Sequence, residues 1–81
     1  MNIMLILCVK QQLDSLVDEM NDWKDEGAKV FLSGITSKTS YGFLFLEWGK
    51  PIPIRFRQKL RDDPDVIDYL VFGTPLPTIS A

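Results

Sequence analysis

The side chains that could carry out catalysis are few in this 81-residue chain. It has no histidine and a single cysteine, so there is no cysteine pair or histidine to hold zinc and no internal disulfide. Cys8 falls in an apolar stretch, where a buried thiol behaves as a small hydrophobe. Four aspartates, at positions 62, 63, 65 and 68, lack the spacing of a calcium loop and are typical of a solvated turn. The sequence therefore predicts a protein that is not an enzyme and has no metal or cofactor.

Basic residues are concentrated in the second half of the chain. Five of the nine lysines and arginines lie within residues 50–61, and on a helix Arg57 and Arg61 share one face. With Lys38 and Lys50, they are the candidate anion contacts. The preceding helix is acidic, which would suit head-to-tail pairing of two copies or attraction of an anion, although two independently solvated surfaces would give the same pattern.

Two further features bear on anionic ligands. The hydroxyl-rich loop 36–40 is a candidate anion site, but it lacks the spacing of a phosphate-binding loop and fits an ordinary hairpin tip equally well. The net charge of −2 argues against a dedicated nucleic-acid binder, which usually carries a basic surplus.

The most informative segment is residues 41–48, a strand that is apolar on both sides. Side chains alternate along a strand, so this run has an aromatic side and a core side. The aromatic side carries Tyr41, Phe43 and Phe45. The opposite side carries Leu44, Leu46 and Trp48. Helices can cover one side, and the other needs a partner or remains an exposed platform.

Hydrophobic periodicity and chain breakers predict six elements. They are a strand at 3–9, a helix from Leu13 to a stop at Gly27, strands at 28–35 and 41–48, a helix that starts at Pro53 or its neighbour and ends by Asp62, and a strand at 66–72. This βαββαβ order predicts an α+β domain of the ferredoxin-like type. Two right-handed crossovers give an antiparallel four-stranded sheet of order 4-1-3-2 with both helices on one face. We expect a single domain at 1–73 and a tail at 74–81.

Residues 39–46 resemble the third strand of RNA recognition motifs, in which aromatic residues alternate around a small residue. The resemblance implies that Tyr41 and Phe43 stack on bases. Thr39 stands where that motif has a basic residue, and Ser40 replaces its first glycine.

Residues 60–69 resemble the end of small regulatory domains of the ACT and Lrp-effector type, in which an amphipathic helix ends in an acidic-proline turn before a strand. Such domains assemble through their sheets and often bind small molecules at the interfaces. The glycine loop that ACT domains use after their first strand has no counterpart in residues 10–12.

From these patterns we expect a non-enzymatic module that self-associates, as a dimer first, through its helix-free sheet face. Tyr41, Phe43 and Phe45 would form its centre, joined by Tyr69, or by Leu70 and Phe72 if the last strand has the opposite phase. The alternatives are a single-stranded RNA platform that uses the same rings, and a small-molecule sensor with its ligand between subunits.

The amino-terminal apolar run is too short, and lacks the basic flank, for a signal peptide. No stretch approaches 18 apolar residues. We therefore expect a cytoplasmic protein with no membrane partner.

Overall fold

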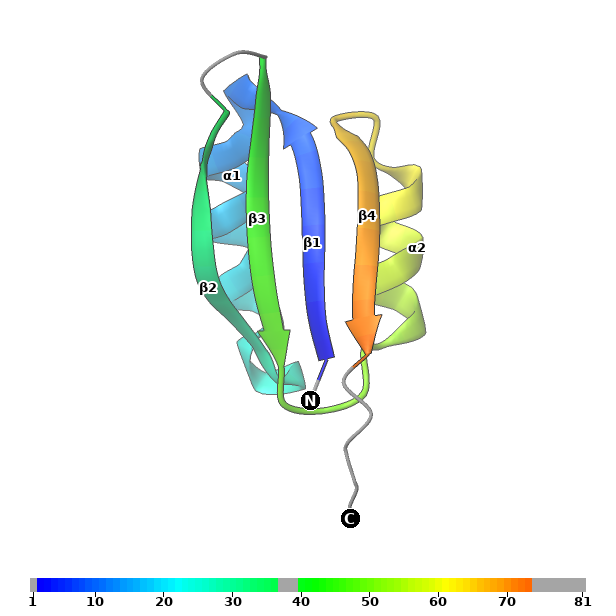
Figure 1. Ribbon diagram of the computed structural model, residues 1–81. Coiled ribbons are helices and arrows are strands. Elements are labelled where there is room, and N and C mark those ends of the chain that lie inside the picture. Colours follow the sequence, from blue (N-terminus) through cyan, green and yellow to red (C-terminus); the bar gives the residue numbers. More distant parts are fainter. Residues whose placement is uncertain (1, 37–39, 74–81) are drawn as a thin grey trace.

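A computed structural model describes residues 2–36 and 40–73. The chain forms one four-stranded antiparallel sheet with its helices on one face (Figure 1). The strands are β1 (Asn2–Val9), β2 (Ala28–Ile35), β3 (Tyr41–Trp48) and β4 (Val66–Gly73), and the helices are α1 (Leu13–Glu19) and α2 (Ile54–Asp62). The expected tail 74–81 lies outside the described residues. Within the described part of the chain, no helix is both long and apolar enough to cross a membrane.

The sheet order is β2-β3-β1-β4, which reads 4-1-3-2 from the β4 edge. β1 and β3 occupy the centre because they are the most uniformly apolar strands, and they pair without interruption from Asn2 opposite Trp48 to Val9 opposite Tyr41. Each edge strand carries one irregularity in its register. In β2 it falls at Phe31, and in β4 it falls at Ile67. An extra residue at such a bulge changes which side chains face which side of the sheet.

The first helical segment is α-helical for only seven residues. It is preceded by the 3-10 turn η1 (Lys10–Gln12) and followed by the 3-10 helix η2 (Met20–Glu26). The prediction of one helix from Leu13 to the stop at Gly27 thus did not anticipate the change to 3-10 geometry after Glu19. Four of the seven η2 residues are Asn, Asp or Trp, which are weaker helix formers. Residues three apart eclipse one another in a 3-10 helix, so Met20 and Trp23 still face the core. The expected stop is confirmed: Gly27 has the left-handed φ of 104° that favours glycine.

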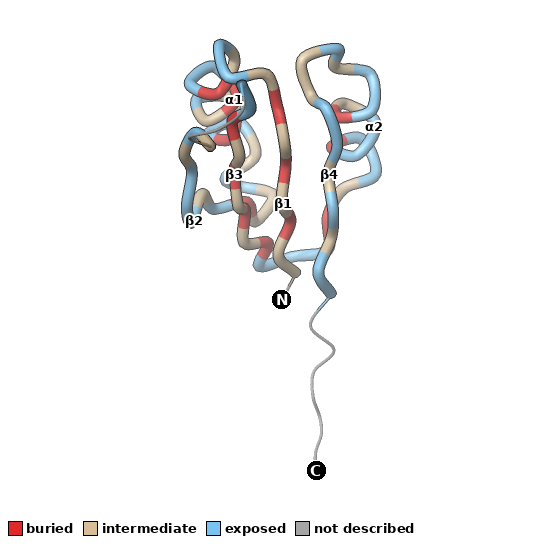
Figure 2. The backbone as a smooth tube through the Cα atoms, turned by 45° about the horizontal axis from the view of Figure 1, so that its top comes forward, coloured by how far each residue is buried: buried red, intermediate tan, exposed pale blue. Residues whose placement is uncertain are grey.

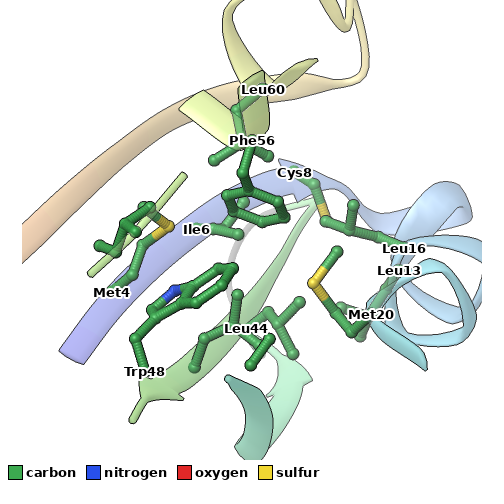
Figure 3. Packing of buried hydrophobic residues seen from close by; sticks show 13 residues of the cluster. Met4, Ile6, Cys8, Leu13, Leu16, Met20, Leu44, Trp48, Phe56 and Leu60 are labelled. Atoms are coloured by element: carbon green, nitrogen blue, oxygen red, sulfur yellow. The ribbon is translucent and has the colours of Figure 1, made fainter. Parts of the chain in front are cut away.

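The core lies between the sheet and the helices (Figure 2). As expected, Leu44, Leu46 and Trp48 face it from β3. Phe56 of α2 is fully buried and makes edge-to-face contacts with two tryptophans. Its ring centroid lies 4.9 Å from that of Trp23 and 4.8 Å from that of Trp48, and Figure 3 shows the Trp48 and Phe56 rings together in the core. The three rings form one aromatic cluster that joins α2, η2 and β3.

Pro53 precedes α2 as its cap, so the helix begins at Ile54. It ends at Asp62, because Asp63 stands before a proline and is extended. Both helices lie on the same face, so within residues 2–36 and 40–73 the opposite face of the sheet has no helix over it (Figure 1).

Candidate functional site

The helix-free face of the sheet is the candidate functional site. Register partners share a face, so the pairing assigns its members strand by strand. Eleven of them are hydrophobic. They are Ile3, Leu5, Leu7 and Val9 of β1, Phe31 and Leu32 of β2, Tyr41, Phe43 and Phe45 of β3, and Leu70 and Phe72 of β4. We call this helix-free side of the sheet the open face.

The aromatic side chains of the open face contact one another. The rings of Phe43 and Phe45 lie 6.1 Å apart, edge to face, and Phe45 lies 6.3 Å from Phe31 in the same geometry. The tip of the Phe43 ring leans over Gly34 of β2, where an added Cβ would come within 3.0 Å of it. Tyr41 is 43% exposed at the end of the row. The aromatic bulk is therefore concentrated on the β2–β3 half of the face.

Tyr69 does not belong to the open face. It lies opposite Ile6 and packs against the core on the helix side. The cause is the bulge at Ile67, which shifts the alternation of β4 after Val66. Leu70 and Phe72 take the open side, with exposed fractions of 53% and 47%. The opposite-phase alternative for the last strand is thus the one observed.

The open face carries little charge among the described residues. Lys29 lies opposite Glu47 at one end of β2 and β3, so these two charges offset each other. Asp68 stands near the other end of β4, and its Oδ1 accepts a hydrogen bond of 2.8 Å from the backbone N–H of Tyr69. The remainder of the face is apolar.

The candidate anion contacts do not gather around the aromatic rings. Arg57 and Arg61 are exposed on α2, on the other side of the sheet. Lys50 is exposed in the segment between β3 and α2, and its Nζ donates a 3.1 Å hydrogen bond to the backbone oxygen of Asp25. Lys38 and most of the loop 36–40 lie outside the described residues. The described cations thus form no basic rim for the open face.

Two other basic residues of α2 explain the charge asymmetry between the helices. Arg55 pairs with Glu26 and lies over the Trp23 ring, 5.0 Å from its centroid. Lys59 pairs with Glu19 of α1. Opposite charges thus meet between partly exposed side chains of the helical segments of one chain.

Cys8 lies in the wall of a cavity of about 50 Å³ between α1 and the turn before β4. Burial raises the pKa of its thiol, and the carboxylates of Asp63 and Asp65 raise it further. The thiol is therefore held protonated. Asp63 is also a turn residue, because its Oδ1 accepts a 2.9 Å hydrogen bond from the backbone N–H of Asp65. Within residues 2–36 and 40–73, no cluster of three His, Cys, Asp or Glu side chains could hold a metal ion.

Sequence reasoning placed three rings on the open face and missed most of its other members. Phe31 was missed because it occupies a bulge, which strict alternation does not reveal. The β1 members could have been found, because an apolar strand at the centre of a sheet must present alternate residues to both faces.

No family model matches the chain, and neither curated proteins nor solved structures gave a match. The open face must therefore be interpreted from its own geometry.

Proposed function

We propose that this chain is a ferredoxin-like, non-enzymatic assembly module that self-associates through the open face, as a dimer first. The observation that carries the proposal is a contiguous sheet face that has eleven hydrophobic residues and is covered by none of the helices in the described part of the chain. Apolar patches beyond a few hundred Å² are uncommon on soluble monomers and mark interaction surfaces.

The size of the face fits a specific interface. Four strands spaced ~4.8 Å apart and eight residues long at ~3.3 Å each give a projected area of roughly 500 Å². The relief of the side chains adds to this area, so two copies would bury about 1,000 Å² or more in total. That is the lower range for specific protein–protein contacts.

The composition of the face fits the same role. Aromatic rings provide large contact area with few torsions to restrict, which suits interface centres. A second copy would also stabilise the domain, because a core in a chain of this length leaves little margin of stability.

The charges favour a protein partner over a nucleic acid. A base-stacking platform needs cations beside its rings to neutralise phosphates. On the open side of the sheet, the register places Lys29 opposite Glu47, while Arg57 and Arg61 belong to α2 on the helix side. The single-stranded RNA platform therefore remains the weaker proposal.

The regulatory role, cytoplasmic location and small-molecule ligand at the interface come from the likeness to ACT and Lrp-effector domains, and they remain proposals. The thiol of Cys8, held protonated in a small cavity, supports the non-enzymatic part.

The test is the solution mass by light scattering coupled to size exclusion. Leu70→Glu and Phe45→Glu place a carboxylate on the open face, and Ile54→Glu is the matched control. Ile54 is 75% exposed at the start of α2, where a glutamate also suits the helix dipole. We expect a dimer for the unchanged chain and for Ile54→Glu, and folded monomers for the two open-face variants.

A monomeric wild type, or open-face variants that stay folded and keep the mass of the dimer, would contradict the proposal. In the first case, salt-dependent binding of a single-stranded oligonucleotide would favour the platform instead.

A further inference from the structure

The two halves of the open face have different shapes. The β2–β3 half carries the contacting rings of Phe31, Phe43 and Phe45. The β1–β4 half is aliphatic in the middle and contains a shallow hollow of about 20 Å³, lined by Leu5, Leu7, Asp68, Tyr69 and Leu70. The hollow has room for about one water-sized group, so it suits the edge of a side chain and not a separate ligand.

The strand register lines these features up in rows across the sheet. One row runs Leu32, Phe45, Leu5, Leu70 from the β2 edge to the β4 edge, and the next runs Gly34, Phe43, Leu7, Asp68. In each row, an aromatic ring of β3 is followed by a leucine of β1. We call the β2–β3 half, which carries the contacting rings, the raised half, and the β1–β4 half, which contains the hollow, the lower half; the line between β3 and β1 divides them.

We infer that two copies pack face to face about a two-fold axis parallel to the strands, between β1 and β3; this inference rests on the proposed function. Such an axis reverses every row. It places Phe45 on the partner's Leu5, and it places Leu32 on the partner's Leu70. The Phe43 ring, which leans toward β2 over Gly34, arrives at the partner's hollow beside β4.

The alternative two-fold axis, perpendicular to the strands, fits the shape less well. It places β3 on the partner's β3, so rings meet rings while the lower halves and their hollows face each other. Interfaces are packed as densely as protein interiors, and empty space between the lower halves forfeits dispersion contacts. The strand-parallel axis puts the raised half of each copy on the lower half of the other.

The ends of the rows agree with this arrangement. The row Lys29, Glu47, Ile3, Phe72 lies at one end of the strands. After reversal, Lys29 lies over the partner's Phe72, where its aliphatic stem covers the ring and its ammonium group reaches water. Glu47 lies near the partner's Ile3, at the rim and within reach of Lys29. The charges remain peripheral and the interface centre is apolar.

The arrangement is tested by cross-linking, with single reporter cysteines in a Cys8→Ala background. Leu32→Cys and Leu70→Cys are a matched pair, because the two leucines are 52% and 53% exposed on opposite edge strands. The strand-parallel axis brings Leu32 over the partner's Leu70. Two copies of Leu32 are separated laterally by three strand spacings, about 14 Å, in addition to ~10 Å between sheets.

A short bismaleimide should therefore join the two variants in a mixture and join neither variant efficiently to itself. Self-linking of Leu32→Cys, or a dimeric mixture without a mixed cross-link, overturns the arrangement. Light scattering of the same samples separates this failure from that of the proposed function: dimers that lack the mixed cross-link contradict only the axis, whereas monomers contradict self-association.

Discussion

The two faces of the sheet contain similar amounts of hydrophobic side chain but differ in what covers them. On the helix side, Met4, Ile6, Leu44 and Leu46 are fully buried under α1, η2 and α2. On the open side, the alternate residues of β1, such as Leu5 and Leu7, are only half-buried in the single chain. The sequence pattern of a strand indicates that both of its faces are apolar. Which of the two faces remains uncovered then depends on the number and placement of the helices.

The largest expected difference between the faces comes from truncating one ring on each. Phe56→Ala removes the ring between Trp23 and Trp48 and should cost about 3–5 kcal/mol of the free energy of unfolding, enough to unfold much of a domain this small. Phe43→Ala removes a half-buried ring of the open face and should cost less than about 2 kcal/mol in the dissociated chain.

Urea unfolding at low protein concentration measures both variants. Equal losses would mean that the open face contributes to the single chain as a second core, and the contrast between the two faces would be lost.

Two glycines provide a finer comparison. Gly42 faces the helix side, where an added Cβ would lie 3.1 Å from the Cβ of Leu13 and 3.3 Å from the Sγ of Cys8. Gly42→Ala should therefore destabilise the chain by about 1–3 kcal/mol, because atoms close to the α1 backbone must shift. Gly34→Ala meets only the tip of the Phe43 ring, which can move outward, and should change the free energy of unfolding by less than about 1 kcal/mol.

Both alanine variants can be compared by thermal or urea denaturation under one set of conditions. A Gly34→Ala loss as large as that of Gly42→Ala would show that Phe43 is held rigidly even without a partner.

The smallest expected effect concerns Cys8, on the helix side. The pKa of its thiol is raised above the ordinary value of 9.0, so the folded chain binds this proton more tightly than the unfolded chain does. The resulting stabilisation is complete below pH 9.0 and is lost as the pH rises through the folded pKa. Cys8→Ala should lose less stability than the unchanged chain over that alkaline range.

Urea midpoints of the two proteins, measured from neutral to alkaline pH, give the comparison. Curves that run parallel throughout would show that the thiol titrates alike in the folded and unfolded chains.

The element order, the core side of β3 and the stop at Gly27 could be predicted, because each depends on local pattern. Apolar alternation assigned Leu44, Leu46 and Trp48 to the core, and a left-handed helix end favours glycine. The prediction that Tyr41, Phe43 and Phe45 lie on the helix-free side of the sheet is confirmed. Its partner and its role stay predictions, because nothing in one chain identifies what covers an apolar face.

The features that could not be predicted are those set by contacts between distant segments. The bulge at Ile67 reverses the phase of β4 and moves Tyr69 to the helix side, and the nearly all-apolar run of β4 does not show which phase the strand takes. The change from α to 3-10 geometry after Glu19 is likewise invisible in an apolar stripe that either helix could carry. The pairing of Arg55 with Glu26 depends on how α2 lies against η2, which no short-range pattern determines.

The aromatic cluster around Phe56 also has a consequence for fluorescence spectroscopy. Both tryptophans of the chain, Trp23 and Trp48, belong to it, and both lie on the helix side of the sheet. Their fluorescence therefore reports the environment of the folded core and is insulated from events on the open face. Tyr41 belongs to the open face, so it is the chromophore whose surroundings would change if a partner bound there. One chain thus carries separate spectral reporters for its folding and for its assembly.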